Sequence, residues 1–390
     1  MQYTVDVAVV GSRCAGSSLA MLLARAGRSV LVVDRGRFPS DRLSTHLLQS
    51  KGVHFLREWG LADELADLGV PRVPLMRFNF GEWWIDLARE PEEGAPPAYV
   101  CAPRRTLLDA MLVDAARDAG ATVLEGTRVV ELRWDGGRVC GFVATSEDGT
   151  THEVAARVVV GADGLHSMVS KAVGADVLFE SPDTTCQVYA YWEGIDQDYM
   201  ELGLRPGCAF GAFLCDQGQV LVSVSRPVSA WHDLWQGGDA AYRGVLEEWF
   251  PATAARVFQG RRVSPLKGTN DLPNVLRRAA GPGWALAGDA AMHKDPVTGL
   301  GISDAFHAAA ALADELAPAL DEADAAVDAA TERATRRVAE ATRPTFDVAV
   351  RCASYDFTEP ELPGVVIGMH DAVRLDLSAV TGETATLLGT

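Results

Sequence analysis

The sequence predicts an α/β fold in which a parallel sheet with flanking helices carries an inserted antiparallel sheet. The first observation is an apolar run at residues 5–10, a helical segment at 17–25 and a second apolar run at 30–33, which together form a βαβ unit. The second is an aromatic, strand-like region at residues 186–226 that interrupts the α/β pattern. The third is a return to a buried strand at 283–287, followed by Ala-rich segments that predict C-terminal helices.

The remaining elements follow from the spacing of apolar residues and from turn signals. Helices are expected at residues 52–59, 104–119, 240–250, 302–316 and 323–341. Strands are expected at residues 77–87, 122–124, 128–134, 139–145, 158–160, 188–192, 208–214 and 220–225. The Asp-Gly-Gly sequence at 135–137 predicts a hairpin turn. The tail at 357–390 has no pattern that decides between a cap, a dimer contact and a disordered end.

The order of these elements predicts three parts. The discontinuous α/β domain is expected to comprise residues 1–74, 98–180 and 265–320. A substrate-binding sheet domain is expected at residues 75–97 and 181–264, and a helical C-terminal segment at 321–390.

The composition limits the partners of the chain. It has 390 residues, 35 of them basic and 53 acidic, and a net charge of −18. This excess disfavours nucleic acids and anionic membranes as partners because both would be repelled. The seven cysteines form no C-x-x-C pair, so neither a metal site nor a disulfide framework is expected. No apolar run has the ~18 residues of a membrane span, and a strand pattern begins near the first residue. A cytoplasmic protein is therefore expected.

The turn after the first predicted strand points to a dinucleotide. It runs from Gly11 to Gly16 and resembles the fingerprint G-x-G-x-x-G, with Arg13 in place of the middle glycine. Gly11 suits the tight turn, and Gly16 suits close helix–strand packing. Asp34 ends the second predicted strand, where a ribose hydroxyl needs an acceptor. A strand–helix turn without a ligand is the alternative for this motif alone.

Two further motifs follow buried strands. The sequence Val-Val-Val-Gly-Ala-Asp-Gly places Asp163 after the strand at 158–160. The sequence Ala-Leu-Ala-Gly-Asp-Ala-Ala places Asp289 after the strand at 283–287, and Gly301 and Ile302 then open a helix. A carboxylate at a strand end can accept a ribitol hydroxyl, and the helix dipole favours negative charge at its N-terminus.

The three motifs together resemble the FAD-dependent monooxygenases of the aromatic-hydroxylase type. The same superfamily includes geranylgeranyl reductases and flavin-dependent halogenases. The resemblance covers about residues 4–316. It implies a Rossmann-type FAD-binding domain with an inserted antiparallel-sheet substrate domain and C-terminal helices, with one FAD bound non-covalently.

The resemblance also implies which residues contact FAD. Those at the pyrophosphate and the adenosine are Gly11, Arg13, Ala15, Gly16, Asp34, Arg35, Arg42, Arg105 and Val129. Those at the ribitol and the flavin are Asp163, Asp289, Gly301 and Ile302. Arg42 and Arg105 could instead form surface salt bridges, Val129 could be core, and Asp163 could close a structural network behind the cofactor.

The chain departs from the aromatic hydroxylases at two positions. Ser170 stands where the second motif usually has an arginine, which puts direct reduction by NADPH in doubt. Met292 stands where the third motif usually has a histidine. The following Pro296-x-x-Gly-x-Gly-Ile sequence is closer to the reductases and halogenases, but the halogenase signature W-x-W-x-I-P is absent.

The resemblance implies an enzyme that oxygenates a small organic substrate, aromatic or a natural product, through a flavin C4a-hydroperoxide. The alternative is a reductase of the geranylgeranyl-reductase type acting on a carbon–carbon double bond. His46 and His293 are candidate catalytic residues, each weighed against a structural role. Candidate substrate-lining residues are Tyr189, Tyr191, Trp192, Phe210, Phe213 and Pro296, although strand alternation turns about half of the aromatic ones away. Molecular oxygen is the co-substrate, and electrons come from NAD(P)H, either directly or through a separate flavin reductase.

Overall fold

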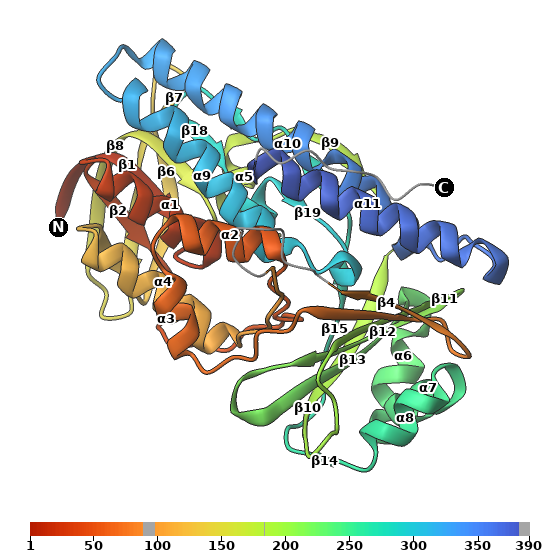
Figure 1. The fold of residues 1–390 in the computed structure, drawn as a ribbon. Helices are drawn as coiled ribbons and strands as arrows, with labels where there is room; N and C mark the ends of the chain where they lie inside the picture. The colour runs from red at the N-terminus through yellow and green to blue at the C-terminus, as the bar shows by residue number, and fades with distance from the viewer. Residues whose placement is uncertain (89–97, 183, 382–390) are drawn as a thin grey trace.

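The computed structural model describes residues 1–88, 98–182 and 184–381. It has two parts: a parallel sheet packed against helices, and a second sheet with its own helices, joined side by side (Figure 1). The predicted α/β architecture with an inserted antiparallel sheet and C-terminal helices is confirmed. Residues 89–97 of the expected sheet domain and 382–390 of the expected tail lie outside the described residues.

The parallel sheet places five strand ends along one edge. Its order is β18-β8-β1-β2-β5, and all of these neighbours pair in parallel. The strands are β1 (Gln2–Val10), β2 (Val30–Val33), β5 (Thr122–Leu124), β8 (Thr151–Gly161) and β18 (Trp284–Leu286). Ligands of open α/β sheets bind outside the carboxyl ends of the strands, where the strand order reverses. Here that point lies at the end of β1.

Both faces of the parallel sheet are covered. Val7 and Val9 of β1 pack against α1 (Cys14–Arg25), and the same apolar cluster includes α4 (Arg105–Asp118) and α9 (Gly301–Ala319). The alternate residue Ala8 packs toward the antiparallel strands β6 (Thr127–Asp135) and β7 (Arg138–Ser146). Strands covered on both faces have continuous apolar runs, which is why the sequence predicted them.

The second sheet has the order β14-β10-β13-β12-β11-β3-β4, with β15 also paired to β10. Its strands are β3 (Leu75–Asn79), β4 (Trp84–Ala88), β10 (Thr185–Glu193), β11 (Met200–Arg205), β12 (Cys208–Leu214), β13 (Gln219–Pro227), β14 (Arg261–Arg262) and β15 (Lys267–Leu272). Neither β11 nor β15 was predicted. The polar sequence of β15 has no apolar alternation, whereas β11 alternates at Met200, Leu202 and Leu204 and was missed. The outer face is covered by α6 (Trp231–Gln236), α7 (Gly238–Trp249) and α8 (Pro251–Val257).

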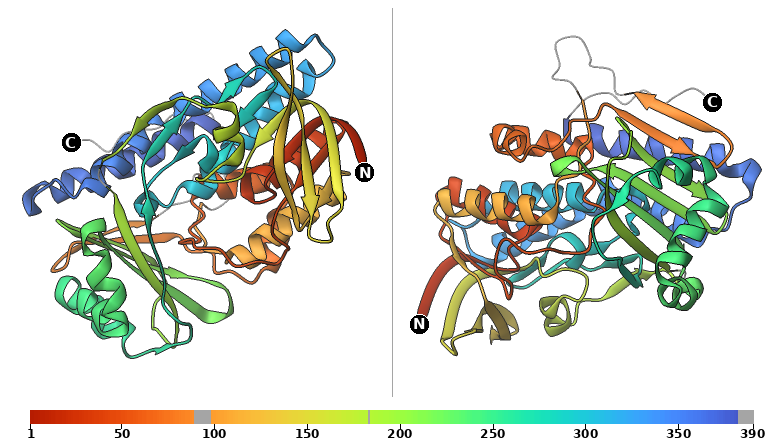
Figure 2. Two further views of the ribbon diagram at one scale, coloured as in Figure 1. Left: turned by 180° about the vertical axis from the view of Figure 1, so that it is seen from behind. Right: turned by 90° about the horizontal axis from the view of Figure 1, so that it is seen from below.

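The inner face of the second sheet turns toward the rest of the molecule. It packs against α11 (Leu362–Thr381), which lies in the tail that the sequence left undecided. α11 follows α10 (Asp324–Ser354), which continues past the predicted end at residue 341. Figure 2 shows both helices from two further sides, running along the parallel-sheet part toward the second sheet.

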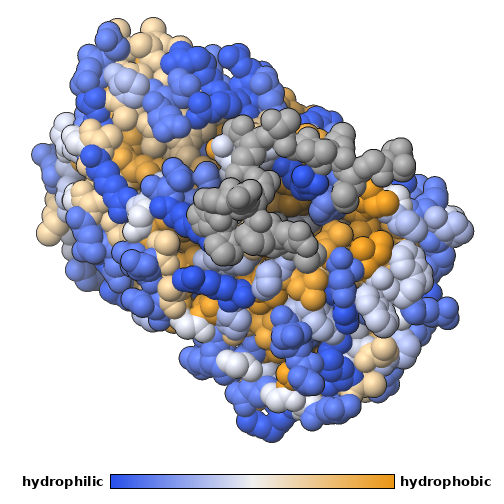
Figure 3. All heavy atoms as spheres, in the orientation of Figure 1, coloured by the Kyte–Doolittle hydropathy of each residue, from blue (hydrophilic) through white to orange (hydrophobic). Residues whose placement is uncertain are grey.

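The smaller elements are α2 (Ser50–Glu58), α3 (Ala62–Asp67), α5 (Met168–Val173), β9 (Val177–Glu180), β16 (Val275–Arg277), β17 (Ala280–Gly281) and β19 (Met292–His293). They include a third sheet of three strands in the order β19-β16-β9, and β17, which pairs with β18. Hydrophilic residues cover much of the face seen in Figure 3, and apolar residues gather where the two parts meet. Within the described residues, every helix is too short or too polar to cross a membrane.

Candidate functional site

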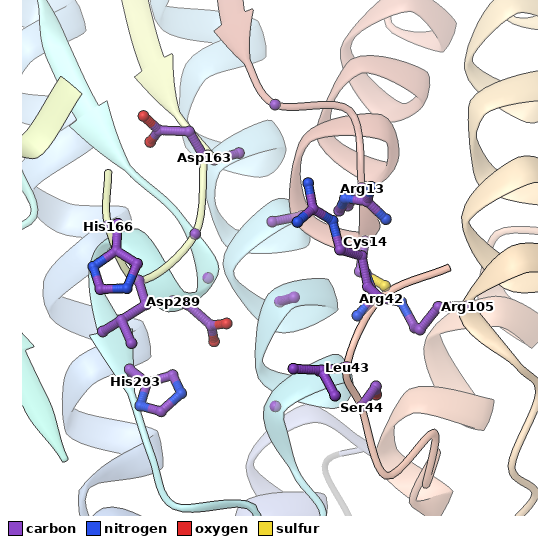
Figure 4. A pocket seen from close by; sticks show the side chains of 18 of the residues that line it. Arg13, Cys14, Arg42, Leu43, Ser44, Arg105, Asp163, His166, Asp289 and His293 are labelled. Atoms are coloured by element: carbon purple, nitrogen blue, oxygen red, sulfur yellow. The ribbon is translucent and has the colours of Figure 1, made fainter. Parts of the chain in front are cut away.

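A cavity of about 1080 Å³ opens at the carboxyl edge of the parallel sheet. This is slightly larger than the ~300–1,000 Å³ of common ligand sites. Its wall at the N-terminus of α1 includes Gly11, Arg13 and Arg105, and we call it the α1 end. Its wall at the N-terminus of α9 includes Pro296 and Gly301 and reaches the second sheet, and we call it the α9 end. Figure 4 shows basic side chains on one wall and two carboxylates on the opposite wall.

Backbone geometry forms the α1 end. Gly11 has φ +98°, and a Cβ there would lie 2.4 Å from the carbonyl oxygen of Ala162. A Cβ on Gly16 would lie 1.8 Å from the carbonyl oxygen of Gly11. Gly16 therefore packs beneath the turn and does not border the cavity, whereas Gly11 and Ala15 do. The first N–H groups of α1 have no side-chain cap, so they are free to bind an anion.

Arginines surround this turn. Arg13 donates to Asp109 at 2.6 Å and to Ser40 at 2.8 Å, so it lies beside the cavity where the fingerprint has a glycine. Arg105 donates to the other oxygen of the same Asp109 at 2.8 Å. Arg42 also borders the cavity, and burial followed by repulsion from Arg13 lowers its pKa. The α1 end is thus positively charged and suited to a pyrophosphate.

Beyond the turn, the end of β2 forms the next part of the wall. Asp34 accepts from the backbone N–H groups of Ser12 at 2.8 Å and Gly36 at 2.7 Å. These bonds fix the carboxylate at the cavity, which Arg35 and Val129 also border. The pairing of β6 with β7 is irregular just after Val129, which brings this strand to the cavity edge.

The two predicted aspartates occupy the opposite wall. One oxygen of Asp163 accepts from the backbone N–H groups of Met168 at 2.6 Å and Val169 at 3.3 Å. Its other oxygen is buried without a partner among the described residues, and burial raises the pKa of Asp163. Asp163 borders the cavity, but its carboxylate makes structural contacts with the start of α5. Asp289 points into the cavity, and no described side chain bonds to its carboxylate (Figure 4).

The α9 end combines a helix N-terminus with two residues of the preceding segment, His293 at the end of β19 and Pro296. Gly301 and Ile302 border the cavity, and the N-terminus of α9 has no side-chain cap. Pro296 and His293 border the same end. The Nδ1 of His293 donates to the backbone carbonyl of Pro273, which fixes the imidazole plane.

Of the five predicted aromatic residues, only Tyr189 borders the cavity. Tyr191 and Phe213 are on the same side of the sheet but belong to the core between the sheet and α11. Trp192 and Phe210 point to the other face and pack with α7 and α8, where the indole N–H of Trp192 donates to Tyr242 at 3.2 Å. Strand alternation explains the separation of Trp192 from its neighbour Tyr191.

His46 lies one layer behind the cavity wall. It is fully buried, and its neighbours Thr45 and Leu47 border the cavity. Its Nε2 shares a hydrogen bond of 2.5 Å with the hydroxyl of Tyr191. Burial, and then the charges of Arg105 and Arg104, lowers the pKa of His46 to about 3. The imidazole is therefore neutral at physiological pH.

Several cavity residues were missed by the sequence reasoning. Gln187 borders the cavity two residues before Tyr189, so strand alternation could have identified it. Thr269 and Leu272 of β15 border it as well, but this polar strand gave no signal. Lys294 also lines the wall and follows directly after the predicted His293.

These residues fit FAD. The glycine turn and uncapped α1 suit the pyrophosphate, and Asp34 suits the adenosine ribose. The Asp289 carboxylate without a described partner suits the ribitol, and the flavin would then lie at the α9 end. The described residues contain no group of three or more His, Cys, Asp or Glu side chains able to hold a metal ion.

Comparisons with known proteins agree with this geometry. Residues 4–224 match the family model described as FAD binding domain. The menaquinone reductase of Mycolicibacterium smegmatis is 30% identical over 316 residues, which cover 77% of this chain and 74% of that protein. The digeranylgeranylglycerophospholipid reductase of Methanothrix thermoacetophila is 28% identical over 327 residues, which cover 83% and 80%.

Two solved structures share the fold. The flavin-dependent brominase Bmp2 superposes with a TM-score of 0.80 at 18% identity, over 97% of this chain and 94% of that one. The probable FAD-dependent monooxygenase pqsL of Pseudomonas aeruginosa gives 0.79 at 20% identity, over 93% and 99%. The family match and the 30% identity to the menaquinone reductase identify this chain as a member of the FAD binding domain family and an FAD-dependent oxidoreductase.

Proposed function

We propose that the chain is an FAD-dependent monooxygenase that oxygenates a compact organic molecule with an aromatic or otherwise flat apolar body. The observation that supports this proposal most strongly is that the inner face of the second sheet forms a wall of the cofactor cavity. Tyr189 and Gln187 of β10 and Leu272 of β15 border the cavity together with Pro296 at the α9 end. A molecule held on this wall would lie directly against the flavin.

The wall is suited to excluding water. Tyr189 is 2% exposed, and Leu47 beside it is equally buried. Behind them lies the apolar cluster that joins the sheet to α11. Exclusion of water protects reactive oxygen species and strengthens electrostatic interactions inside the site. Bound FAD would supply the redox chemistry, while these residues would bind and orient the substrate.

The oxygenation needs two electrons, which reduce the second oxygen atom of O2 to water. We propose NAD(P)H as their source, either directly or through a separate flavin reductase. Arg35 and Arg42 border the cavity without a carboxylate partner among the described residues, and they offer charge for a phosphate-bearing reductant. A role in natural-product biosynthesis would follow from the compact organic substrate.

The second candidate is a reductase of a carbon–carbon double bond. It is favoured by the identity to the menaquinone and digeranylgeranylglycerophospholipid reductases. In this reaction a hydride reaches one carbon, and a proton must reach the other. The Tyr189 hydroxyl is a candidate donor, because it is buried at the cavity and its proton has no acceptor among the described residues.

Isotope labelling separates the two candidates. The purified flavoprotein would be incubated with NADPH under ¹⁸O2, with a panel of phenols and a panel of short prenylated quinones. The same mixtures would be run without oxygen, and the products would be analysed by mass spectrometry. Tyr189→Phe would be tested in parallel.

The monooxygenase predicts one ¹⁸O atom in the product and no turnover without oxygen. The reductase predicts a product with two added hydrogens that forms without oxygen, and a loss of that product in Tyr189→Phe. Oxygen consumption without a labelled product would contradict the first candidate. If neither product forms while the flavin is reduced, both proposals fail.

A further inference from the structure

A chain of four buried charges extends away from the α9 end of the cavity. The Nζ of Lys294 lies 2.7 Å from Oδ2 of Asp304, whose Oδ1 lies 3.3 Å from the Nζ of Lys51. Lys51 in turn lies 2.6 Å from Oδ1 of Asp376. All four residues are buried, and none is more than 8% exposed. We call this set the charge chain.

The charge chain joins segments that are distant in sequence. Lys51 belongs to α2, Asp304 to the first turn of α9 and Asp376 to the C-terminal helix α11. Lys294 follows β19 and also donates to the hydroxyl of Thr345 on α10 at 2.7 Å. The helix α2 contacts both α9 and α11 (Figure 1).

Lys294 links the charge chain to the cofactor cavity. It borders the cofactor cavity and also a second cavity of about 460 Å³ between α9 and α10. Gly301, which opens α9, borders both cavities as well. The positive charge of Lys294 therefore lies at the end of the cavity that fits the flavin.

The balance of charge depends on α11. With all four groups ionised, the positive charges of Lys51 and Lys294 balance the negative charges of Asp304 and Asp376. Burial raises the pKa of Asp376, and the ion pair with Lys51 opposes this and favours the charged carboxylate. Burial alone would raise the pKa of Asp304, but the neighbouring charges of Lys294 and then Lys51 lower it. Asp376 is the member contributed by α11, and without its charge the remaining three would carry a net charge of +1. His307, one helical turn from Asp304, stays neutral because burial and then Lys51 lower its pKa to about 3.

A buried set of ion pairs contributes little net stability, because desolvation offsets the attraction between the charges. Its position next to the flavin end suggests an electrostatic role. We propose that Asp376 is a positioning residue that acts on bound FAD through Lys51, Asp304 and Lys294, so that docking of α11 sets how readily the flavin is reduced. Reduction adds negative charge to the flavin, and a more positive neighbourhood favours it.

This inference depends on FAD binding and on neither proposed reaction. The test is the reduction potential of the flavin-bound protein, measured by titration with dithionite against a reference dye. Asp376→Asn should raise the reduced-to-oxidised ratio at a fixed potential about tenfold, which is about 30 mV for a two-electron couple. Lys294→Met should shift the ratio in the opposite direction.

The double variant Lys51→Met/Asp376→Asn separates charge from structure. It removes one charge of each sign, so its potential should return to that of the unmodified protein. It also keeps the proposal testable if Asp376→Asn alone folds poorly, because it leaves no unpaired buried lysine. The control is Glu359→Gln, which removes a surface ion pair with Arg205 just before α11 and should leave the potential unchanged.

Three results would overturn the inference. The first is an unchanged or lowered reduction potential in Asp376→Asn. The others are a shift as large as that of Asp376→Asn in the double variant or in Glu359→Gln. None of them requires a substrate or oxygen. Failure here is therefore distinguishable from failure of the proposed monooxygenase.

Discussion

The two ends of the cofactor cavity are formed in different ways. At the α1 end the backbone determines the shape: Gly11 turns the chain, and the N–H groups of α1 face the cavity. At the α9 end, side chains from distant segments determine the wall, including Tyr189 of β10, Leu272 of β15 and Lys294. The first end can bind a group common to all dinucleotides, and the second can vary with the substrate. Catalytic variety on a shared fold resides in such side-chain walls.

The largest effect on FAD binding is expected at the backbone-formed end. Gly11→Ala should weaken FAD binding at least ~100-fold, or about 2.8 kcal/mol, because its Cβ meets the Ala162 backbone. Gly120→Ala is the matched control, since Gly120 also has a positive φ, +103°, but no atom near its Cβ position. Flavin fluorescence during titration of the apoprotein measures both. Equal losses in the two variants would show that backbone strain, not the close approach, limits binding.

On the second sheet, the two faces should respond differently. Trp192→Ala should lower the free energy of unfolding by about 3–5 kcal/mol, because it empties a buried site against α7. Its FAD affinity should stay within about twofold of the unmodified protein. Tyr189→Phe should instead leave stability within about 1 kcal/mol and alter turnover. Urea unfolding and flavin titration measure these effects, and a large loss of FAD affinity in Trp192→Ala would contradict the assignment of its face.

Two consecutive arginines, Arg104 and Arg105, test whether the two ends of the cavity are independent. Arg105 bonds to Asp109 at the α1 end, whereas Arg104 pairs with Asp216 at the second sheet. Arg105→Gln should weaken FAD binding about 10–100-fold, in line with the ~1.5–3 kcal/mol of a charged hydrogen bond. Arg104→Gln should leave FAD affinity unchanged and lower the melting temperature. If both variants lose FAD equally, the two ends are not independent.

The most gradual effect concerns pH and the buried histidines. The pKa values of His46 and His307 are lowered to about 3, in both cases chiefly by burial. An unfolded histidine titrates near 6.5, so below this pH the unfolded state gains protons first and stability falls until about pH 3. Each histidine should contribute up to ~1.4 kcal/mol per pH unit in this window.

His46→Gln should reduce that slope between about pH 6 and 4, as measured by urea unfolding at several pH values. His232→Gln, at an exposed position on α6, is the control and should leave the slope unchanged. An unaltered slope in His46→Gln would mean that His46 is protonated in the folded protein.

The same contrast explains what could be predicted from the sequence. The α1 end was predicted because its signals are local: a strand, a glycine turn, a helix and Asp34. Arg13 illustrates the limit of that reasoning: the sequence placed it in the turn as a cofactor contact, but only the structure shows its bond to Asp109. The predicted cavity residues there, other than Gly16, all border the cavity.

The α9 end could not be predicted in the same detail. Its wall includes β15, a polar strand that gives no periodic signal, and the core behind it includes α11, which belonged to the undecided tail. Tyr191 and Phe213, which were predicted to line the substrate site, instead pack in the core between the sheet and α11. Such contacts depend on long-range packing, which the sequence does not express as a pattern.

The strand order of the parallel sheet has a consequence for biosynthesis. β1 and β2 leave the ribosome first, but β18 and the start of α9, which complete the cofactor cavity, lie near residues 284–302. Synthesis proceeds at ~5–20 residues per second, so the nascent chain spends many seconds with its glycine turn formed and the opposite wall missing. FAD therefore reaches its full site late in translation or after it. Because a ligand that binds only the folded state stabilises it, free FAD during expression should raise the yield of folded chain.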